Sequence, residues 1–324
     1  MLLAGTTDGV YRVSDTDTFE SERVLETDRA MRVRTFDSVA GAFAATKSGL
    51  YHSLDGTDWV DLGVPREEVY SVAVNSSGDH LYAGTHPAHV YVSTSFAATS
   101  FAAESDDRAC EWEELTGFQE LPSRSEWHTP RHRNEAHVRS LGFDPENPER
   151  LIAGVEVGGV HVSDDRGQTW DERRIAFDAP HSNDVHHVLV QTSDRYVAST
   201  GSGLYRTTDA GHSWTRIDED VDHTYFREAF AADGRLYAAA ARGAPPTWGG
   251  DLGPDAALFE STDGGDSFET VSYPGAPNEF VLAWTARDGS VFAGTRGGYV
   301  LRRTDGEWIE VGRLSVSIRS LSGV

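Results

Sequence analysis

Arginine recurs at one position of a repeated apolar segment, and guanidinium groups gathered in this way are suited to binding an anion. The segments share a V-x-x-L pattern, and aligning them on it gives a column that reads Arg34, Tyr70, Arg139, His186, Arg227, Val281 and Arg319. Guanidinium groups that converge on one axis repel one another unless an anion lies between them. A carboxylate or phosphate would be held there by forked hydrogen bonds. We therefore predict a ligand site from these residues, Val281 excepted.

Acidic side chains fall in or beside the same segments, and they leave two interpretations open. These residues are Glu156, Asp184, Glu228 and Glu279. In the first interpretation the carboxylates neutralise the arginines. In the second a pair of them is catalytic, because cleavage of a glycosidic bond needs two carboxyl groups about 5–10 Å apart. Glu156 paired with Glu228 or Glu279 is then the candidate.

Two insertions add further polar and aromatic side chains to the same region. His128, His132 and His137 lie in or just after the connection 116–136, spaced at i, i+4 and i+9. Histidine is a common zinc ligand, but no helix fixes this spacing, so we expect surface histidines, no bound metal and no cofactor. The insertion 243–255 carries Trp248, which either stacks on a sugar at the predicted site or packs its own loop.

The elements that must position these residues form a repeat of roughly 40 residues, a period typical of propeller blades. Each copy has an apolar segment, a strand ending in A-G-T or a relative, a turn, and a strand ending in Ser or Thr. The strands alternate with period 2 and are rich in Val, Tyr and Thr, which indicates β-structure rather than a helical solenoid. The first copy lacks its leading segment, and a spare one, SIRSLSGV (317–324), ends the sequence.

The count predicts an all-β fold: a single seven-bladed β-propeller over residues 1–324, with four antiparallel strands per blade. The C-terminal strand closes blade 1, because a closed ring leaves no long unpaired inner edge. The predicted blades are 316–324 with 1–25, 32–63, 69–115, 137–175, 185–218, 223–272 and 279–312. Blade 3 contains a long insertion, 94–111, with the only cysteine, Cys110.

The turns between third and fourth strands carry a motif, S/T-x-D-x-G-x-x-W/F. Three full copies occur: SDDRGQTW (163–170), TTDAGHSW (207–214) and STDGGDSF (261–268). The aspartate accepts amide hydrogens of the turn, the glycine supplies a positive φ, and the aromatic ring packs under the hairpin. We therefore interpret a set of nine residues as structural: Asp165, Gly167, Trp170, Asp209, Gly211, Trp214, Asp263, Gly265 and Phe268.

This motif resembles the Asp-box, or BNR, repeat of sialidases, sortilin-type receptors and photosystem II assembly factors. The chain as a whole resembles β-propeller proteins of haloarchaeal type that are often described as glycosyl hydrolases. A sialidase would carry an R-I-P motif and usually six blades, whereas Ala176 follows Arg174-Ile175 here. The assembly-factor resemblance implies seven blades with an axial arginine patch that binds a protein partner.

The net charge of the chain limits the environments in which it is expected to work and the partners it is expected to bind. The net charge is −24, and only one of the 28 basic residues is a lysine, Lys47. A surface poor in lysine and rich in aspartate is typical of proteins from a high-salt cytoplasm, where salt screens self-repulsion; an ordinary acidic protein is the alternative. Such a chain repels phosphate backbones, so we expect no nucleic-acid partner and no membrane. The N-terminus has no basic or long apolar region of a secretory signal, which predicts a cytoplasmic location.

Two functions follow from these features. The first is a binding or assembly propeller that recognises an anionic small molecule, a carbohydrate or a protein partner at the arginine- and histidine-lined mouth of its channel. The alternative is a carbohydrate-active enzyme, a glycoside hydrolase or lyase, that uses carboxylates at the same mouth.

Overall fold

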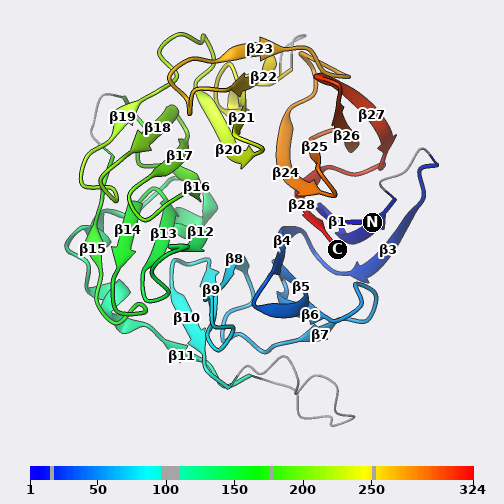
Figure 1. The fold of residues 1–324 in the computed structure, drawn as a ribbon. Coiled ribbons are helices and arrows are strands. Elements are labelled where there is room, and N and C mark those ends of the chain that lie inside the picture. Colours follow the sequence, from blue (N-terminus) through cyan, green and yellow to red (C-terminus); the bar gives the residue numbers. More distant parts are fainter. Residues whose placement is uncertain (15–17, 96–109, 176–178, 250–252) are drawn as a thin grey trace.

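The computed structural model describes residues 1–14, 18–95, 110–175, 179–249 and 253–324, and it is a ring of seven β-sheets around a central axis (Figure 1). Every sheet has four antiparallel strands. The predicted seven-bladed propeller is therefore confirmed. Most of the insertion 94–111 lies outside the described residues. None of the helices in the described part of the chain has the length and apolar character needed to span a lipid bilayer.

In each blade the strands follow one another from the axis outward. Blade 1 consists of β28 (Ile318–Gly323), β1 (Leu2–Thr6), β2 (Gly9–Val13) and β3 (Ser21–Glu26), and blade 2 of β4 (Ala30–Phe36), β5 (Val39–Thr46), β6 (Gly49–Ser53) and β7 (Val60–Asp61). Blade 3 consists of β8 (Val69–Val74), β9 (Leu81–Thr85), β10 (Val90–Ser93) and β11 (Glu113–Glu114). Blade 4 consists of β12 (His137–Phe143), β13 (Leu151–Glu156), β14 (Gly159–Ser163) and β15 (Asp171–Glu172). Blade 5 consists of β16 (Val185–Val190), β17 (Tyr196–Thr200), β18 (Gly203–Thr207) and β19 (Thr215–Arg216). Blade 6 consists of β20 (Tyr225–Ala232), β21 (Arg235–Ala241), β22 (Ala256–Ser261) and β23 (Glu269–Val271). Blade 7 consists of β24 (Val281–Arg287), β25 (Ser290–Thr295), β26 (Tyr299–Thr304) and β27 (Glu307–Arg313).

The C-terminal strand closes the ring as predicted. Strand β28 pairs antiparallel with β1, so that Leu2 faces Gly323 and Ala4 faces Leu321. Blade 1 is thus built from both ends of the chain (Figure 1). This pairing supplies β1 with a hydrogen-bonded neighbour on its axial side, which would otherwise be an open edge.

Every innermost strand has a register shift near its start. In each blade, one or two residues at the shift have no partner on the second strand: Arg319, Met31, Tyr70, Arg139, His186, Arg227 with Glu228, and Leu282. A bulge of this kind re-aims the side chain of the extra residue.

This register corrects the sequence alignment at two positions. Met31 and Leu282, not Arg34 and Val281, are equivalent to Arg139. Arg34 lies three residues further along β4. The reason is that Ala30, which is fully buried, fills the apolar position that valine fills in blades 3 and 4. Because its side chain is small, the apolar V-x-x-L pattern of the sequence does not show the start of β4.

The motif turns lie between the third and fourth strands and satisfy their own polar groups. Asp165 Oδ1 accepts a hydrogen bond from the Thr169 amide at 2.8 Å, and the Gly167 amide donates to Ser163 Oγ at 2.7 Å. The other two full copies, at 207–214 and 261–268, repeat these bonds. The Ser213 hydroxyl and amide lower the pKa of Asp209 to about 2. These carboxylates are therefore engaged within their turns.

Candidate functional site: the two ends of the axial channel

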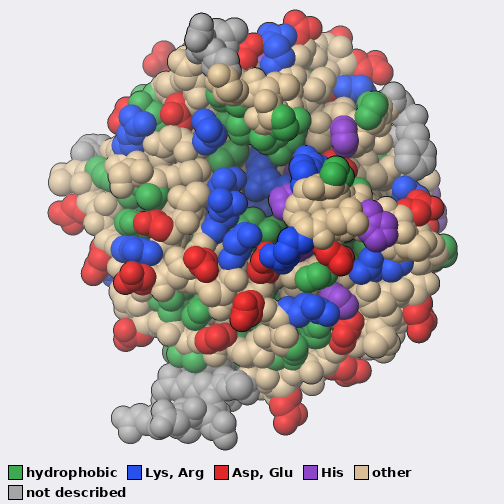
Figure 2. Space-filling view, turned by 180° about the vertical axis from the view of Figure 1, so that it is seen from behind, with side chains coloured by type: hydrophobic (Ala, Val, Ile, Leu, Met, Phe, Trp, Pro, Cys, Tyr) green, Lys and Arg blue, Asp and Glu red, His purple; other side chains and the backbone are tan. Residues whose placement is uncertain are grey.

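One end of the channel, which we call the upper mouth, is where the innermost strands begin. Figure 2 shows this face, with arginine and lysine side chains gathered around a central hollow. Of the predicted ligand residues, Tyr70, Arg139, His186, Arg227 and Arg319 belong to the register shifts at this end. Arg34 does not, because it lies further along its strand, toward the other end.

The part of the upper mouth around Arg319 is cationic. Burial lowers the pKa of Arg319 to about 10, and the guanidinium groups of Arg29, Arg139 and Arg296 contribute to that lowering. Arg319 Nε is buried without a hydrogen-bond partner. Within the described chain, no carboxylate lies within ion-pair distance of Arg319 or Arg227.

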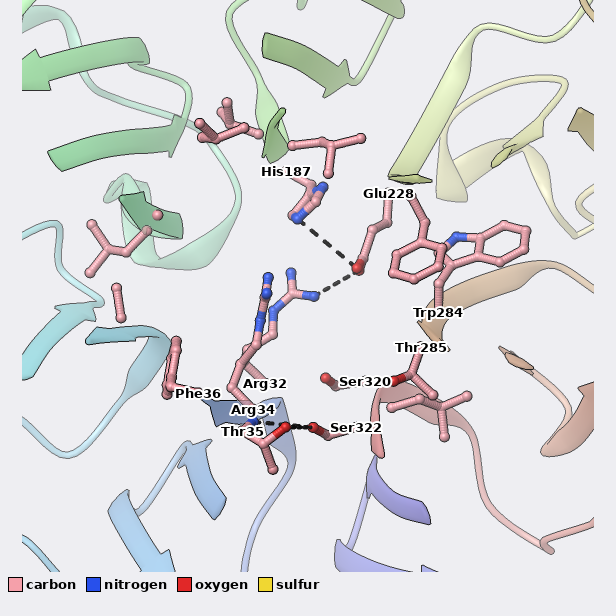
Figure 3. A pocket seen from close by; sticks show the side chains of 18 of the residues that line it. Arg32, Arg34, Thr35, Phe36, His187, Glu228, Trp284, Thr285, Ser320 and Ser322 are labelled. Carbon is pink, nitrogen blue, oxygen red and sulfur yellow. Dashed lines mark hydrogen bonds and ion pairs between the residues drawn. The ribbon is translucent and has the colours of Figure 1, made fainter. Parts of the chain in front are cut away.

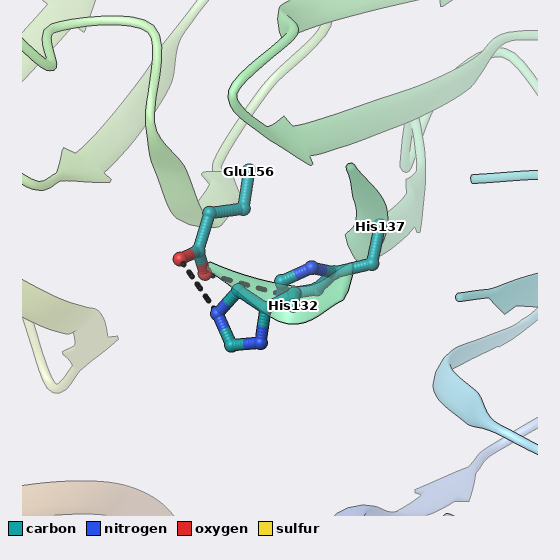
Figure 4. Close-up of side chains that lie close together, drawn as sticks. All are labelled: His132, His137 and Glu156. Carbon is teal, nitrogen blue, oxygen red and sulfur yellow. Dashed lines mark ion pairs between the residues drawn. The ribbon is translucent and has the colours of Figure 1, made fainter. Parts of the chain in front are cut away.

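Blade 4 contributes an ion pair to the same mouth. Arg139 Nη1 donates to Glu156 Oε2, and both residues are buried. His137 Nε2 lies 3.2 Å from the same oxygen, and His132 Nε2 lies 3.6 Å from Oε1 (Figure 4). Burial alone would raise the pKa of Glu156, but Arg139 and His137 hold that pKa well below its usual range. Glu156 is therefore an ionised group, fixed by its neighbours.

An unusual turn presents His132 to this pair. His132, Arg133 and Asn134 have successive φ values of 49°, 59° and 63°, a left-handed region that costs energy for residues other than glycine. The turn forms the short 3₁₀ helix η4 (His132–Asn134). His86 Nε2 lies 3.0 Å from the carbonyl oxygen of His132, and Arg133 Nη1 donates to Glu68 Oε1 at 2.8 Å. These two contacts hold the turn in place.

Asp184 is a second carboxylate beside Glu156. Arg131 Nη2 lies 3.0 Å from Asp184 Oδ2 and 3.9 Å from Glu156 Oε1, so one guanidinium contacts both acids. Burial and the charge of Glu156 raise the pKa of Asp184. The two neighbouring carboxyl groups thus have pKa values shifted in opposite directions.

The predicted histidine trio is only partly brought together. Donor atoms of His132, His137 and Glu156 lie within 4.8 Å of one another, which is a spacing that a divalent metal could bridge. His128 is exposed, and its Nδ1 lies 3.4 Å from the carbonyl oxygen of Asn134. Because Arg139 already donates to Glu156, a metal ion at this cluster would have to displace a guanidinium group.

Trp248 lies at the edge of the upper mouth. Its ring is 5.8 Å from the rings of both Tyr225 and Phe280, and the guanidinium of Arg296 lies 5.5 Å above it. Its Nε1 donates to the carbonyl of Gly243 at 2.8 Å. The indole is therefore half-buried and packs its own loop while it supports Arg296.

The other end of the channel holds a pocket of about 400 Å³, which we call the lower pocket (Figure 3). Arg32 Nη1 donates to Glu228 Oε2 at 2.7 Å, and His187 Nε2 lies 4.0 Å from Glu228 Oε1. Arg34 lies beside Arg32 in this pocket. Two of the predicted residues, Arg34 and Glu228, therefore belong to the lower pocket rather than to the upper mouth.

The third candidate acid, Glu279, lies just before β24 and is bound by donors at the end of β25 and in the turn that follows it. Its Oε2 accepts hydrogen bonds from Thr295 Oγ1 at 2.8 Å and from the Gly297 amide at 2.6 Å. A carboxylate held by these donors stabilises the turn that follows β25.

Three arginines of the upper mouth fall outside the aligned column of the sequence: Arg29, Arg131 and Arg296. Arg296 directly follows the A-G-T that ends β25, and Arg29 directly precedes β4. A search for arginine at these strand boundaries would have found them. Arg131 lies in the connection 116–136, where no repeat pattern predicts its position.

Comparison with known proteins places the fold beside both enzymes and binding proteins. No family model matches the chain. A xyloglucanase, Xgh74A from Acetivibrio thermocellus, is 24% identical over 170 residues, which cover 43% of this chain and 20% of that protein. The GH74 xyloglucanase of Xanthomonas campestris superposes with a TM-score of 0.60 at 19% identity, over 87% of this chain and 45% of that one. YCF48 bound to D1 peptide superposes with a TM-score of 0.58 at 15% identity, over 96% and 84%.

These similarities show the propeller fold. The chain spans about a fifth of the length of the xyloglucanase that it matches in sequence. A shared propeller does not decide function, because the same fold carries catalytic and binding sites. Function therefore has to be inferred from the geometry of the channel.

Proposed function

We propose that the chain is a binding propeller that takes up an anionic group at the upper mouth. The group is a carboxylate or phosphate of a small molecule, a carbohydrate or a protein partner. The observation that carries the proposal is that no carboxylate among the described residues lies within ion-pair distance of Arg319 or Arg227, although the chain has a net charge of −24. Acidic side chains are abundant, yet the described structure brings none of them to these two arginines.

The energetics of burial support this function. A partly buried cation without a counterion loses solvation that nothing in the protein returns. Here the neighbours of Arg319 are three further guanidinium groups, which add repulsion. A bound anion would remove both penalties and would be held by charge-assisted hydrogen bonds.

Calorimetric titration with D-glucuronate and with inorganic phosphate tests the proposal, with D-glucose as the uncharged counterpart of glucuronate. We expect binding of the anions but not of glucose, and a loss of about tenfold or more in Arg319→Gln or Arg227→Gln. Arg12→Gln is the matched control, because Arg12 pairs with the exposed Glu22 on an outer strand. Equal binding by Arg319→Gln and the wild type, or no anion binding at all, contradicts the proposal.

A second candidate function is a carbohydrate-active enzyme, supported by the xyloglucanase similarity and by one feature of the site. Asp184 and Glu156 have pKa values shifted in opposite directions, and such a pair can divide the roles of acid and base. Both carboxyl groups are buried. Under this alternative, xyloglucan or a related glucan is hydrolysed and Asp184→Asn abolishes turnover while the fold is kept. Absence of hydrolysis across a glycan panel leaves the binding function.

A further inference from the structure

The lower pocket is a chamber with one excess positive charge. Arg32 and Arg34 both line it, whereas Glu228 is the only carboxylate among its described lining residues. His187 is buried, and burial lowers its pKa to about 3, so it is neutral near pH 7. The pocket therefore contains two guanidinium groups and one carboxylate.

Of the two guanidinium groups in the lower pocket, that of Arg34 is not paired with Glu228. Glu228 accepts its hydrogen bond from Arg32 at 2.7 Å, and no described carboxylate lies within ion-pair distance of Arg34. Figure 3 shows the two guanidinium groups side by side, pointing into the pocket. Burial and the charge of Arg32 lower the pKa of Arg34 to about 10. Glu228 acts in the opposite direction but does not cancel this lowering, so the protein maintains a cation that is only partly compensated in a partly enclosed space.

Polar atoms without partners lie at the same place. His187 Nδ1 and Trp284 Nε1 are buried without a hydrogen-bond partner in the described structure, and both residues line the pocket. His187 is 4% exposed and Trp284 3%. Buried polar atoms are nearly always hydrogen-bonded, so these two atoms are exceptions. Both are closed off from solvent, so the contacts of a ligand in the pocket would come from other atoms.

Most of the other residues that line the pocket have apolar side chains. Aromatic and aliphatic side chains surround the pocket: Phe36, Phe143, Phe230, Trp284, Leu141 and Val190. Hydroxyl groups of Thr35 and Ser322 also line it, 3.0 Å apart. A volume of about 400 Å³ is within the range of small-molecule pockets.

We propose that the lower pocket binds a small monocarboxylate with an apolar body, whose carboxylate is held by Arg34 and whose body lies against the aromatic side chains. One negative charge balances the single excess cation. A second negative charge would lie close to Glu228 and be repelled. This site is separate from the anion site proposed at the upper mouth, and it is made of different residues.

Calorimetry with 4-phenylbutyrate tests this inference, with 4-phenylbutanamide as the neutral isostere. We expect the carboxylate to bind at least tenfold more tightly than the amide. Arg34→Gln should remove that difference, while Arg166→Gln, which changes the same charge on an exposed turn, should keep it. A wild-type protein that binds carboxylate and amide equally overturns the inference without any variant being made.

One further variant separates the two ends of the channel. Arg319→Gln should leave phenylbutyrate binding unchanged while it weakens glucuronate binding, and Arg34→Gln should do the reverse. If Arg319→Gln abolishes phenylbutyrate binding, the carboxylate binds at the upper mouth and the lower-pocket site is rejected. If glucuronate binding fails but the phenylbutyrate results hold, only the function proposed for the upper mouth is lost.

Discussion

Arg139 and Glu156 form a buried ion pair across the first two strands of blade 4. Arg139 is the residue without a strand partner at the register shift, and Glu156 pairs in register with His137 at the start of the blade. The bulge in β12 therefore turns a guanidinium group back toward an acid of its own blade. Arg227 and Arg319 occupy the equivalent positions of their blades without such an acid in the described structure.

Breaking this pair should destabilise the protein strongly. Glu156→Gln leaves Arg139 as a buried cation without a counterion, which is expected to cost about 3–5 kcal/mol in the free energy of unfolding. Glu22→Gln, which breaks an exposed pair with Arg12, should cost less than about 1 kcal/mol. Urea unfolding of both variants measures the difference. Similar losses for the two would show that the pair in blade 4 is solvated in solution.

Acid should destabilise the fold through its buried histidines before the carboxylates titrate. Burial lowers the pKa of His137 and of His161 to about 4, while unfolded histidine titrates near about 6.5. Between these pH values the unfolded chain binds more protons, so stability falls as the pH drops from about 6.5 toward 4. The free energy of unfolding, measured at about pH 7.5 and about pH 5, should differ by about 1–2 kcal/mol per histidine.

A single variant tests the origin of that pH effect. His161 packs against Phe118 and Trp127, so His161→Phe keeps an aromatic ring there and removes the titrating group. Its stability should vary less between the two pH values than that of the wild type. An unchanged pH dependence would assign the effect to other groups.

The glycine of a motif turn should resist substitution. Gly167 has φ of +95°, and a Cβ there would lie 2.4 Å from Leu115 Cδ1. Gly167→Ala should therefore lower the free energy of unfolding by about 1–3 kcal/mol. Gly249→Ala is the control, because an added Cβ at Gly249 would meet nothing within 4 Å and its φ is not in the left-handed region. Thermal unfolding that shifts equally in both variants would contradict the steric argument.

Divalent metal should bind poorly to the histidine cluster of the wild type. Arg139 already donates to Glu156, the carboxylate that a metal would need. Arg139→Gln frees that carboxylate, so Zn²⁺ should raise the melting temperature of this variant more than that of the wild type. The double variant with His132→Ala should lose the gain. A wild type that is already stabilised by equimolar Zn²⁺ would show that the guanidinium does not protect the site.

The sequence predicts the ring because the information is local. Strand periodicity, the motif turns and the spare C-terminal segment each depend on neighbouring residues, and together they specify seven blades and their closure. Positions in the channel depend on register, and Ala30 is too small to show the register of β4 in the apolar pattern. Partners depend on contacts across blades, such as Arg32 with Glu228. No spacing within one repeat predicts that Arg32 pairs with Glu228 while Arg34 has no such partner in the described structure.

Strand β28 joins the integrity of the ring to ligand uptake. It closes blade 1, and the same strand supplies Arg319 to the upper mouth and Ser320 and Ser322 to the lower pocket. If β28 separates from β1, both ends of the channel lose residues that line them, while the other six blades keep all their strands. Binding and conformation are thermodynamically linked, so any ligand that contacts β28 stabilises the pairing of β28 with β1. Loss of ligand would then be the first step by which the ring opens.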